Sequence, residues 1–274
     1  DAGRILYESE GKREIVMLNY IKSEFYRVFQ GRVFYLLTGA LSGLTVLMNV
    51  ILYLFNRFVF EFPYGSIKYS LNILSGSMTV LLLGGMLVTS FMFSEEHKNG
   101  TLKNAVSSGI SRGQFFTGKC IVCSAASLIC MVVVLGFYYG SAYLLLNDPG
   151  GISVAARLKG VAANLPMAFA AVILTVALMC MIKKEITMTI WWMGIIWVVP
   201  LLSFIAGLQI EWLNKAAEWM PWNYLKYETT VNMSEYKCLW DTPEGLAKCL
   251  IAGIIGIVVF YAAGLLAFRK KEVA

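Results

Sequence analysis

The sequence predicts an all-α polytopic membrane protein with six transmembrane helices. Of its 274 residues, 58% are hydrophobic and 15% are charged, whereas a soluble domain carries roughly 25% charged residues. The charges are also unevenly placed, because six stretches of 20 to 28 residues contain no Asp, Glu, Lys or Arg. Each stretch can cross the roughly 30 Å core of a bilayer as a helix, where one charge would cost about 2.5–3.5 kcal/mol.

The uncharged stretches divide the chain into three parts. An amino-terminal segment is expected at 1–32, a six-helix transmembrane domain at 33–268 and a short tail at 269–274. Within the transmembrane domain we expect an inner loop at 94–118, an aromatic outer loop at 210–247, and spans at about 33–55, 70–93, 119–146, 160–182, 186–209 and 248–268.

The distribution of Lys and Arg sets the predicted orientation. With the amino terminus in the cytoplasm, the inner segments hold 15 of the 23 Lys and Arg residues and the outer segments hold 8. Basic residues accumulate in the cytoplasmic loops of membrane proteins, so both termini are predicted to be cytoplasmic. The same topology accounts for the net charge of +6, and no basic and aromatic pattern indicates a nucleic-acid partner.

Residues 14–32 predict an amphipathic helix ahead of the first span. Apolar side chains recur on one face, while Lys22, Arg27 and Gln30 face away from it. Such a helix lies on the cytoplasmic leaflet and contacts membrane lipid; the alternative is a plain helical lead-in to the first span. The apolar face consists of Ile15, Leu18, Ile21, Phe25, Val28 and Phe29.

The outer loop at 210–247 is rich in Trp and Tyr, which favour the membrane interface, so short helices in the outer leaflet are expected there. No Ser/His/Asp set is visible, and the single His argues against a zinc site. We therefore predict no catalytic residue, no metal and no cofactor. The cysteines are expected to be packing residues, and a disulfide between Cys238 and Cys249 stays open.

One stretch, "GQFFTGKC", has the Gly113, Gly118 and Lys119 spacing of a phosphate-binding loop. Such a loop needs a Ser or Thr on Mg²⁺ and a soluble helix after it. Here Cys120 takes that position and opens a 28-residue apolar run. Nucleotide binding is therefore not predicted. We expect Lys119 to mark the cytoplasmic end of the third span, with its ammonium among headgroups and acidic groups of a partner.

The wider segment 93–119, "FSEEHKNGTLKNAVSSGISRGQFFTGK", carries Glu96-x-x-x-Gly100-Thr101-Leu102, then Ser111-Arg112, then Gly118-Lys119. This pattern resembles the cytoplasmic loop of type 2 ABC transporter permeases. The six-span layout, the amino-terminal amphipathic helix and the long outer connection are also similar to that family. The resemblance therefore covers nearly the whole chain.

The resemblance implies a permease subunit that is not itself an enzyme and works with a separate cytosolic ABC ATPase. It also implies a homodimer, or a heterodimer with a related permease, in a bacterial plasma membrane. The expected activity is export of an amphiphilic peptide, drug or lipid-like substrate, as in the bacitracin-resistance and lantibiotic-immunity permeases that the chain resembles. By position, the residues that match the ATPase-coupling segment are Glu96, Gly100, Thr101, Leu102, Val106, Arg112 and Lys119.

Family analogy places a substrate path beside spans one, two and five. The residues there with polar or adaptable side chains are Asn49, Ser75, Ser77, Thr79, Met188, Trp191 and Trp192. Met and Trp suit contact with varied apolar ligands, although helix packing is the competing role for each. Two other functional classes stay open at this point: an ion-coupled secondary transporter, which would need ionisable groups inside the spans, and a non-transporting membrane scaffold or sensor.

Overall fold

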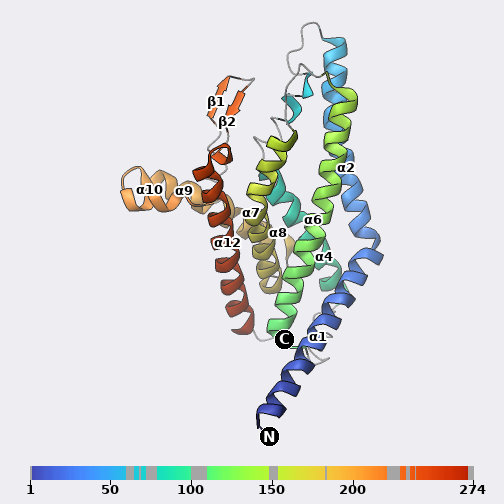
Figure 1. Cartoon of the computed structure of the whole chain (residues 1–274), viewed down its shortest axis with the longest axis vertical. Coiled ribbons are helices and arrows are strands. Elements are labelled where there is room, and N and C mark those ends of the chain that lie inside the picture. The colour runs from blue at the N-terminus through green and yellow to red at the C-terminus, as the bar shows by residue number, and fades with distance from the viewer. Residues whose placement is uncertain are drawn as a thin grey trace.

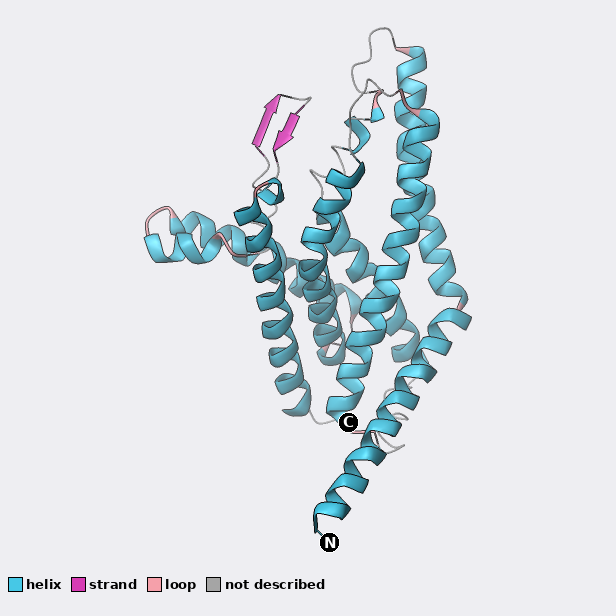
Figure 2. Cartoon of the chain, in the orientation of Figure 1, coloured by secondary structure: helices cyan, strands magenta, loops and turns pink. Residues whose placement is uncertain are grey.

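The computed structural model describes residues 2–59, 65–67, 69–71, 79–99, 110–147, 154–182, 184–220, 229–232, 235–237 and 239–270. Apart from one short hairpin, the regular structure of these residues is helical (Figure 2). In chain order the elements are α1 (Ala2–Gln30), α2 (Arg32–Phe58), α4 (Thr79–Asn99), α6 (Arg112–Leu145), α7 (Val154–Met181), α8 (Glu185–Met193), the π-helical turn η1 (Gly194–Val198), α9 (Val199–Gly207), α10 (Glu211–Ala217), β1 (Thr229–Asn232), β2 (Glu235–Lys237), the 3₁₀ turn η2 (Leu239–Asp241) and α12 (Pro243–Lys270).

The predicted all-α polytopic membrane fold is confirmed. Within the described residues, five helical stretches are long and apolar enough to cross a membrane: Arg32–Phe58, Arg112–Leu145, Leu158–Met181, Glu185–Gly207 and Pro243–Lys270. The predicted second span, 70–93, corresponds to α4, whose apolar part is the shorter helix Leu81–Ser94. Residues 72–78, just before α4, lie outside the described part of the chain.

Helix α7 is the centre of the bundle. Of its most apolar window, 67% is buried, against 17–33% for the other four candidate spans. It packs most extensively on α12, where Gly253 lets the two backbones meet: a Cβ at this position would lie 2.5 Å from Pro166 Cβ and 2.7 Å from Met167 N. Small residues permit this close approach of helices in lipid. The centre is therefore an α7–α12 pair, flanked by α4 and α6.

Helix α1 runs obliquely at the lower end of the bundle and then turns at Gly31 into α2 (Figure 1). Its predicted apolar face is buried only in part. Val28 is buried, and Phe25 packs against the same cluster, but Ile15 and Leu18 are 60% and 65% exposed. The carboxyl-terminal half of α1 is thus held by α6 and α2, while Ile15 and Leu18 are exposed.

The described ends of the chain, Ala2 of α1 and Lys270 of α12, lie at the same end of the bundle, as the predicted topology requires (Figure 1). Near the opposite end, residues 210–247 contain α10, which folds back on α9, and a small antiparallel hairpin of β1 and β2. Short helices were predicted for this loop and α10 is one of them. The hairpin was not predicted.

Candidate functional site

The start of α6 is fixed by a capping box and by a contact with the end of α12. Ser111 Oγ accepts a hydrogen bond from the backbone N–H of Gln114, and the Gln114 side chain accepts one from the Ser111 N–H. This arrangement satisfies amides that would otherwise lack partners at a helix start. Arg112 donates a hydrogen bond of 3.0 Å to the backbone carbonyl of Arg269, in the last turn of α12. Carbonyl groups in the last turn of a helix lack partners within the helix and can accept such bonds.

Lys119 is buried, contrary to its predicted place among lipid headgroups. It is 1% exposed, and its Nζ lies 2.6 Å from Oε2 of Glu24 on α1. The rings of Tyr20, Phe93 and Phe115 surround the ammonium, with centroids 5.4–6.0 Å away. The prediction was wrong because α1 folds over this part of α6 and supplies a carboxylate within the chain itself.

Gly118 and Tyr20 explain how α1 comes so close. A Cβ at Gly118 would lie 2.7 Å from Cε1 of Tyr20, so only glycine leaves room for this ring against α6. The stretch that resembles a phosphate-binding loop is therefore a continuous helix from Arg112 onward, and its glycine and lysine are contacts for α1. A phosphate-binding loop needs backbone amides exposed ahead of a helix, and here they lie inside one.

We call the contacts of Glu24 with Lys119 and of Arg112 with Arg269 the α1–α6–α12 joint. It links α1, α6 and α12 at the end of the bundle where the predicted coupling segment connects α4 to α6. Among the predicted coupling residues, Glu96 lies in the last turns of α4. The other four, Gly100, Thr101, Leu102 and Val106, lie outside the described residues.

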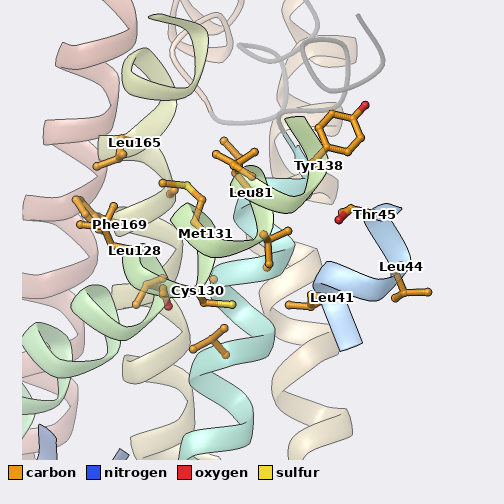
Figure 3. Close-up of a pocket in the computed structure, with 18 of the residues that line it drawn as sticks. Leu41, Leu44, Thr45, Leu81, Leu128, Cys130, Met131, Tyr138, Leu165 and Phe169 are labelled. Atoms are coloured by element: carbon orange, nitrogen blue, oxygen red, sulfur yellow. The ribbon is translucent and has the colours of Figure 1, made fainter. Parts of the chain in front are cut away.

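A cavity of about 330 Å³ lies between the middle turns of α2, α4, α6 and α7 (Figure 3). Its wall contains no charged side chain, and its few polar side chains belong to Thr45, Ser127 and Tyr138. The remaining lining residues are Leu41, Leu44, Met48, Leu81, Gly84, Gly85, Val88, Leu128, Cys130, Met131, Val134, Leu135, Leu165, Ala168, Phe169 and Val172. The cavity suits an apolar ligand of moderate size.

Of the predicted substrate-path residues whose side chains the structure describes, Asn49, Met188, Trp191 and Trp192, none lines this cavity. Ser75 and Ser77 lie outside the described residues, and Thr79 begins α4. Met188 and Trp192 are fully buried, and the indole N–H of Trp192 donates to the carbonyl of Ala171 on α7. Trp191, next to Trp192 in the same helix, is 58% exposed. Their role in transport stays a prediction, and the contacts of Met188 and Trp192 are those of packing residues.

Asn49 belongs to a buried polar network directly above the cavity. Its Nδ2 donates to Ser141 Oγ at 2.7 Å and to the carbonyl of Tyr138 at 3.0 Å. Ser70 Oγ donates to Asn49 Oδ1 at 2.7 Å and also lies 2.9 Å from the Tyr138 hydroxyl. Each group thereby obtains partners that lipid could not offer. The network joins α2 to α6 through Tyr138, which also lines the cavity.

Comparison with known families identifies the chain. A family model described as ABC-2 family transporter protein matches residues 20–200, which include α2, α4, α6, α7 and α8. The chain belongs to the ABC-2 transporter family. The predicted resemblance to type 2 ABC permeases is therefore confirmed, while no curated protein matches the sequence. As an ABC-2 permease it is a multi-pass membrane subunit that works with an ABC ATPase and does not itself carry the ATPase.

Sequence reasoning missed the two most specific features of this permease. Glu24 and Lys119 are 95 residues apart, and neither carries a local signal that it will be paired. The cavity is lined by leucines, methionines and glycines that also occur throughout the other spans. For the described residues, no group of three His, Cys, Asp or Glu side chains is placed to hold a metal. Cys249 is buried and free, so it is not paired with Cys238.

Proposed function

We propose that this ABC-2 permease exports an amphiphilic substrate across a bacterial plasma membrane, driven by a cytosolic ATPase that docks on the segment after α4. The observation that carries the proposal is the position of the cavity. Its wall includes both α4 and α6, the two helices that the coupling segment connects. A movement imposed on that segment therefore acts directly on two of the four walls.

The α1–α6–α12 joint determines which helices would move together with the start of α6. Residues 110–119 are tied to α1 through Lys119 and to α12 through Arg112, so the start of α6 cannot shift alone. Packed helices respond to a local displacement by moving as rigid elements between discrete arrangements. ATP binding by the partner would thus move α6 together with α1 and α12 and change the shape of the cavity that α6 lines.

The residues proposed to receive the ATPase are Glu96, Gly100, Thr101, Leu102 and Val106. Leu102, Val106 and Ile110 recur every four residues and form an apolar stripe that fits a groove on a partner. Arg112 and Lys119 then act inside the permease, as positioning residues at the start of α6. We propose a dimer of permeases, identical or related, because a pair of ATPase subunits needs two docking segments.

The substrate class follows from the cavity. An apolar wall without charge accepts the hydrocarbon part of a molecule and leaves its charged part outside. Peptides with apolar side chains, drugs and lipid-like molecules share this division. Bacitracin-type and lantibiotic-type peptides are included among them, and resistance or immunity is the proposed physiological outcome.

Replacing Leu102 with Asp tests the docking proposal. Loss of an apolar anchor and burial of an unpaired charge at an interface cost about 2–4 kcal/mol, so the amount of ATPase that copurifies with the permease should fall at least about tenfold. The variant should still insert, because the substitution lies outside the spans. Membrane yield and copurified ATPase are measured together, by immunoblot and mass spectrometry.

Ser108→Asp is the matched control, because it adds the same charge to the same segment away from the apolar stripe. It should retain the ATPase. If Leu102→Asp copurifies as much ATPase as the parent chain, the docking site lies elsewhere. If no ATPase copurifies even with the parent chain under gentle extraction, the ATP-driven assembly itself is contradicted.

A further inference from the structure

We infer that α9 and α10 form an arm that swings about the π-helical turn η1 and is latched to α12 by an ion pair. The arm, residues 199–218, consists of α9, α10 and the short turn between them. Figure 1 shows both helices projecting sideways from the bundle. The inference goes beyond the proposed function and does not depend on it.

Close packing of the fifth span ends at η1. Met188, Trp192 and Ile196 recur every four residues along α8 and η1, and all three are fully buried. Helix α8 packs on α7, so this face of the span is fixed in the bundle. The next helix differs, because Pro200 and Gly207 are the only buried residues of α9. The chain is therefore anchored as far as η1, and α9 extends beyond the anchored part.

The backbone at η1 is built to bend. The N–H of Val199 donates to the carbonyl of Gly194, five residues back, where an α-helix would use a carbonyl four residues back. Pro200 follows and supplies no N–H to the preceding turn. A Cβ built at Gly194 would meet no atom within 4 Å, so this side of the turn is open. Helices bend sharply at π-turns and at Pro, and glycine adds backbone freedom.

Helices α9 and α10 are packed closely enough to move as one body. The most extensive packing of α9 is with α10. A Cβ at Gly207 would lie 2.7 Å from the Cα of Asn214, so the two backbones meet directly at this glycine. Closely packed helices keep their contacts and rotate as rigid elements about a hinge. A bend at η1 therefore carries both helices of the arm together.

An ion pair holds the far end of the arm. Glu218, at the end of α10, accepts a hydrogen bond of 3.0 Å from Nζ of Lys248, in the first turns of α12. The same ammonium lies 5.3 Å from the ring centroid of Trp219. The side chains of Lys248 and Glu218 are 21% and 36% exposed, so water weakens their attraction. A contact of this modest strength makes a latched and a released position both accessible.

Double electron–electron resonance on the full-length chain in lipid nanodiscs tests the arm. Spin labels are attached at Lys215→Cys on α10 and at Leu144→Cys on α6, since both positions are exposed. Cys238 is replaced by Ser, and the five other cysteines are buried. We expect a main distance for the latched arm and a minor one for the released arm. Raising the salt from about 0.1 M to about 1 M shortens the Debye length from about 10 Å to about 3 Å, and should increase the minor population.

Glu218→Gln tests the latch. The released population should increase about threefold to fivefold, the effect of losing a partly exposed ion pair. Glu211→Gln is the matched control, because it removes the same charge from an exposed position in the first turn of the same helix. Its distances should equal those of the parent chain. Exchanging the charges, with Glu218→Lys and Lys248→Glu together, should restore most of the latched population, which a general loosening of α10 would not allow.

Gly194→Ala tests the hinge. Gly194 has helical dihedral angles, φ −56° and ψ −49°, so alanine fits there and restricts the chain in any bent form. The released population should fall about twofold to fivefold. Gly136→Ala is the control, because a Cβ at Gly136 on α6 also meets no atom within 4 Å.

Two results would overturn the inference. A single distance that neither salt nor Glu218→Gln changes would make the arm a rigid part of the bundle. A response to Glu218→Gln without any difference between Gly194→Ala and Gly136→Ala would place the hinge outside η1. Both measurements use the permease alone, so a failure to find an ATPase or a substrate would contradict the proposed function and leave this test intact.

Discussion

Glu24→Gln should release α1 from the bundle, since it removes the carboxylate that faces a buried ammonium. Lys119 is 1% exposed and the Glu24 side chain 14% exposed, so the pair is largely shielded from water. Breaking a buried ion pair from one side costs about 3–5 kcal/mol. The remaining exposure of Glu24 and the aromatic rings around Lys119 place the expected loss near the lower limit, at about 3 kcal/mol.

Lys119→Met should cost less than Glu24→Gln. Met has a similar length and no charge to bury, and Glu24 keeps its ion pair with Arg27 at 2.8 Å. We expect about 1–2 kcal/mol for this change. The double variant should resemble Lys119→Met alone, because the amide that replaces the Glu24 carboxylate then no longer faces an ammonium. The order of the stability losses in the three variants therefore tests the ion pair itself. A general weakening of the α1–α6 contact would not produce this order.

Hydrogen–deuterium exchange of the amides in residues 20–30, in nanodiscs, is the assay. If α1 detaches by local opening, a loss of about 3 kcal/mol accelerates exchange about 150-fold. Lys22→Met is the control, since Lys22 is exposed on the same helix and its removal should leave exchange unchanged. Exchange within threefold of the parent in Glu24→Gln, or a larger effect of Lys119→Met, would refute the reasoning.

Two further predictions concern the hydrogen bonds of Asn49 and the orientation of the chain in the membrane. Asn49→Leu should lower the melting temperature of the purified permease, because its bonds to Tyr138 and Ser141 are each worth about 0.6–1.7 kcal/mol in a membrane; an unchanged melting temperature would contradict a structural role. Cys238, outside the described residues, should react with a membrane-impermeant maleimide in intact cells after mild reduction, whereas a cysteine introduced by Ser108→Cys should react only after the cells are opened. Labelling of the latter from outside would reverse the assigned orientation.

The spans were predictable because burial in a bilayer acts on each residue separately. A charge inside the hydrocarbon core is costly whatever its neighbours are, so the uncharged runs alone locate α2, α6, α7 and α12. The start of α6 could also be predicted from neighbouring residues, because Ser111 and Gln114 have capping-box spacing. In the sequence, however, Ser111-Arg112 was recognised only as part of a family pattern. Such features depend on residues within one turn of each other.

The site was less predictable because it depends on residues far apart in the chain. Lys119 directly precedes an apolar run, and from that position its ammonium should reach the headgroups. It is buried because Tyr20 fits over Gly118 and brings Glu24 of α1 to within 2.6 Å. The polarity of Asn49 predicts a substrate contact, whereas the structure surrounds it with partners from α6 and with Ser70.

By itself, the sequence determined that this is a helical membrane protein, where its spans lie and which family its coupling segment resembles. Those properties follow from hydropathy and local motif, which act over one or a few helical turns. Only the tertiary structure decided which glycines bring helices together, which lysine is paired and where four spans leave room for a ligand. Packing in lipid depends on the shapes of facing helix surfaces, and a leucine that lines the cavity, such as Leu135, has the same sequence signal as Leu144, which is 86% exposed.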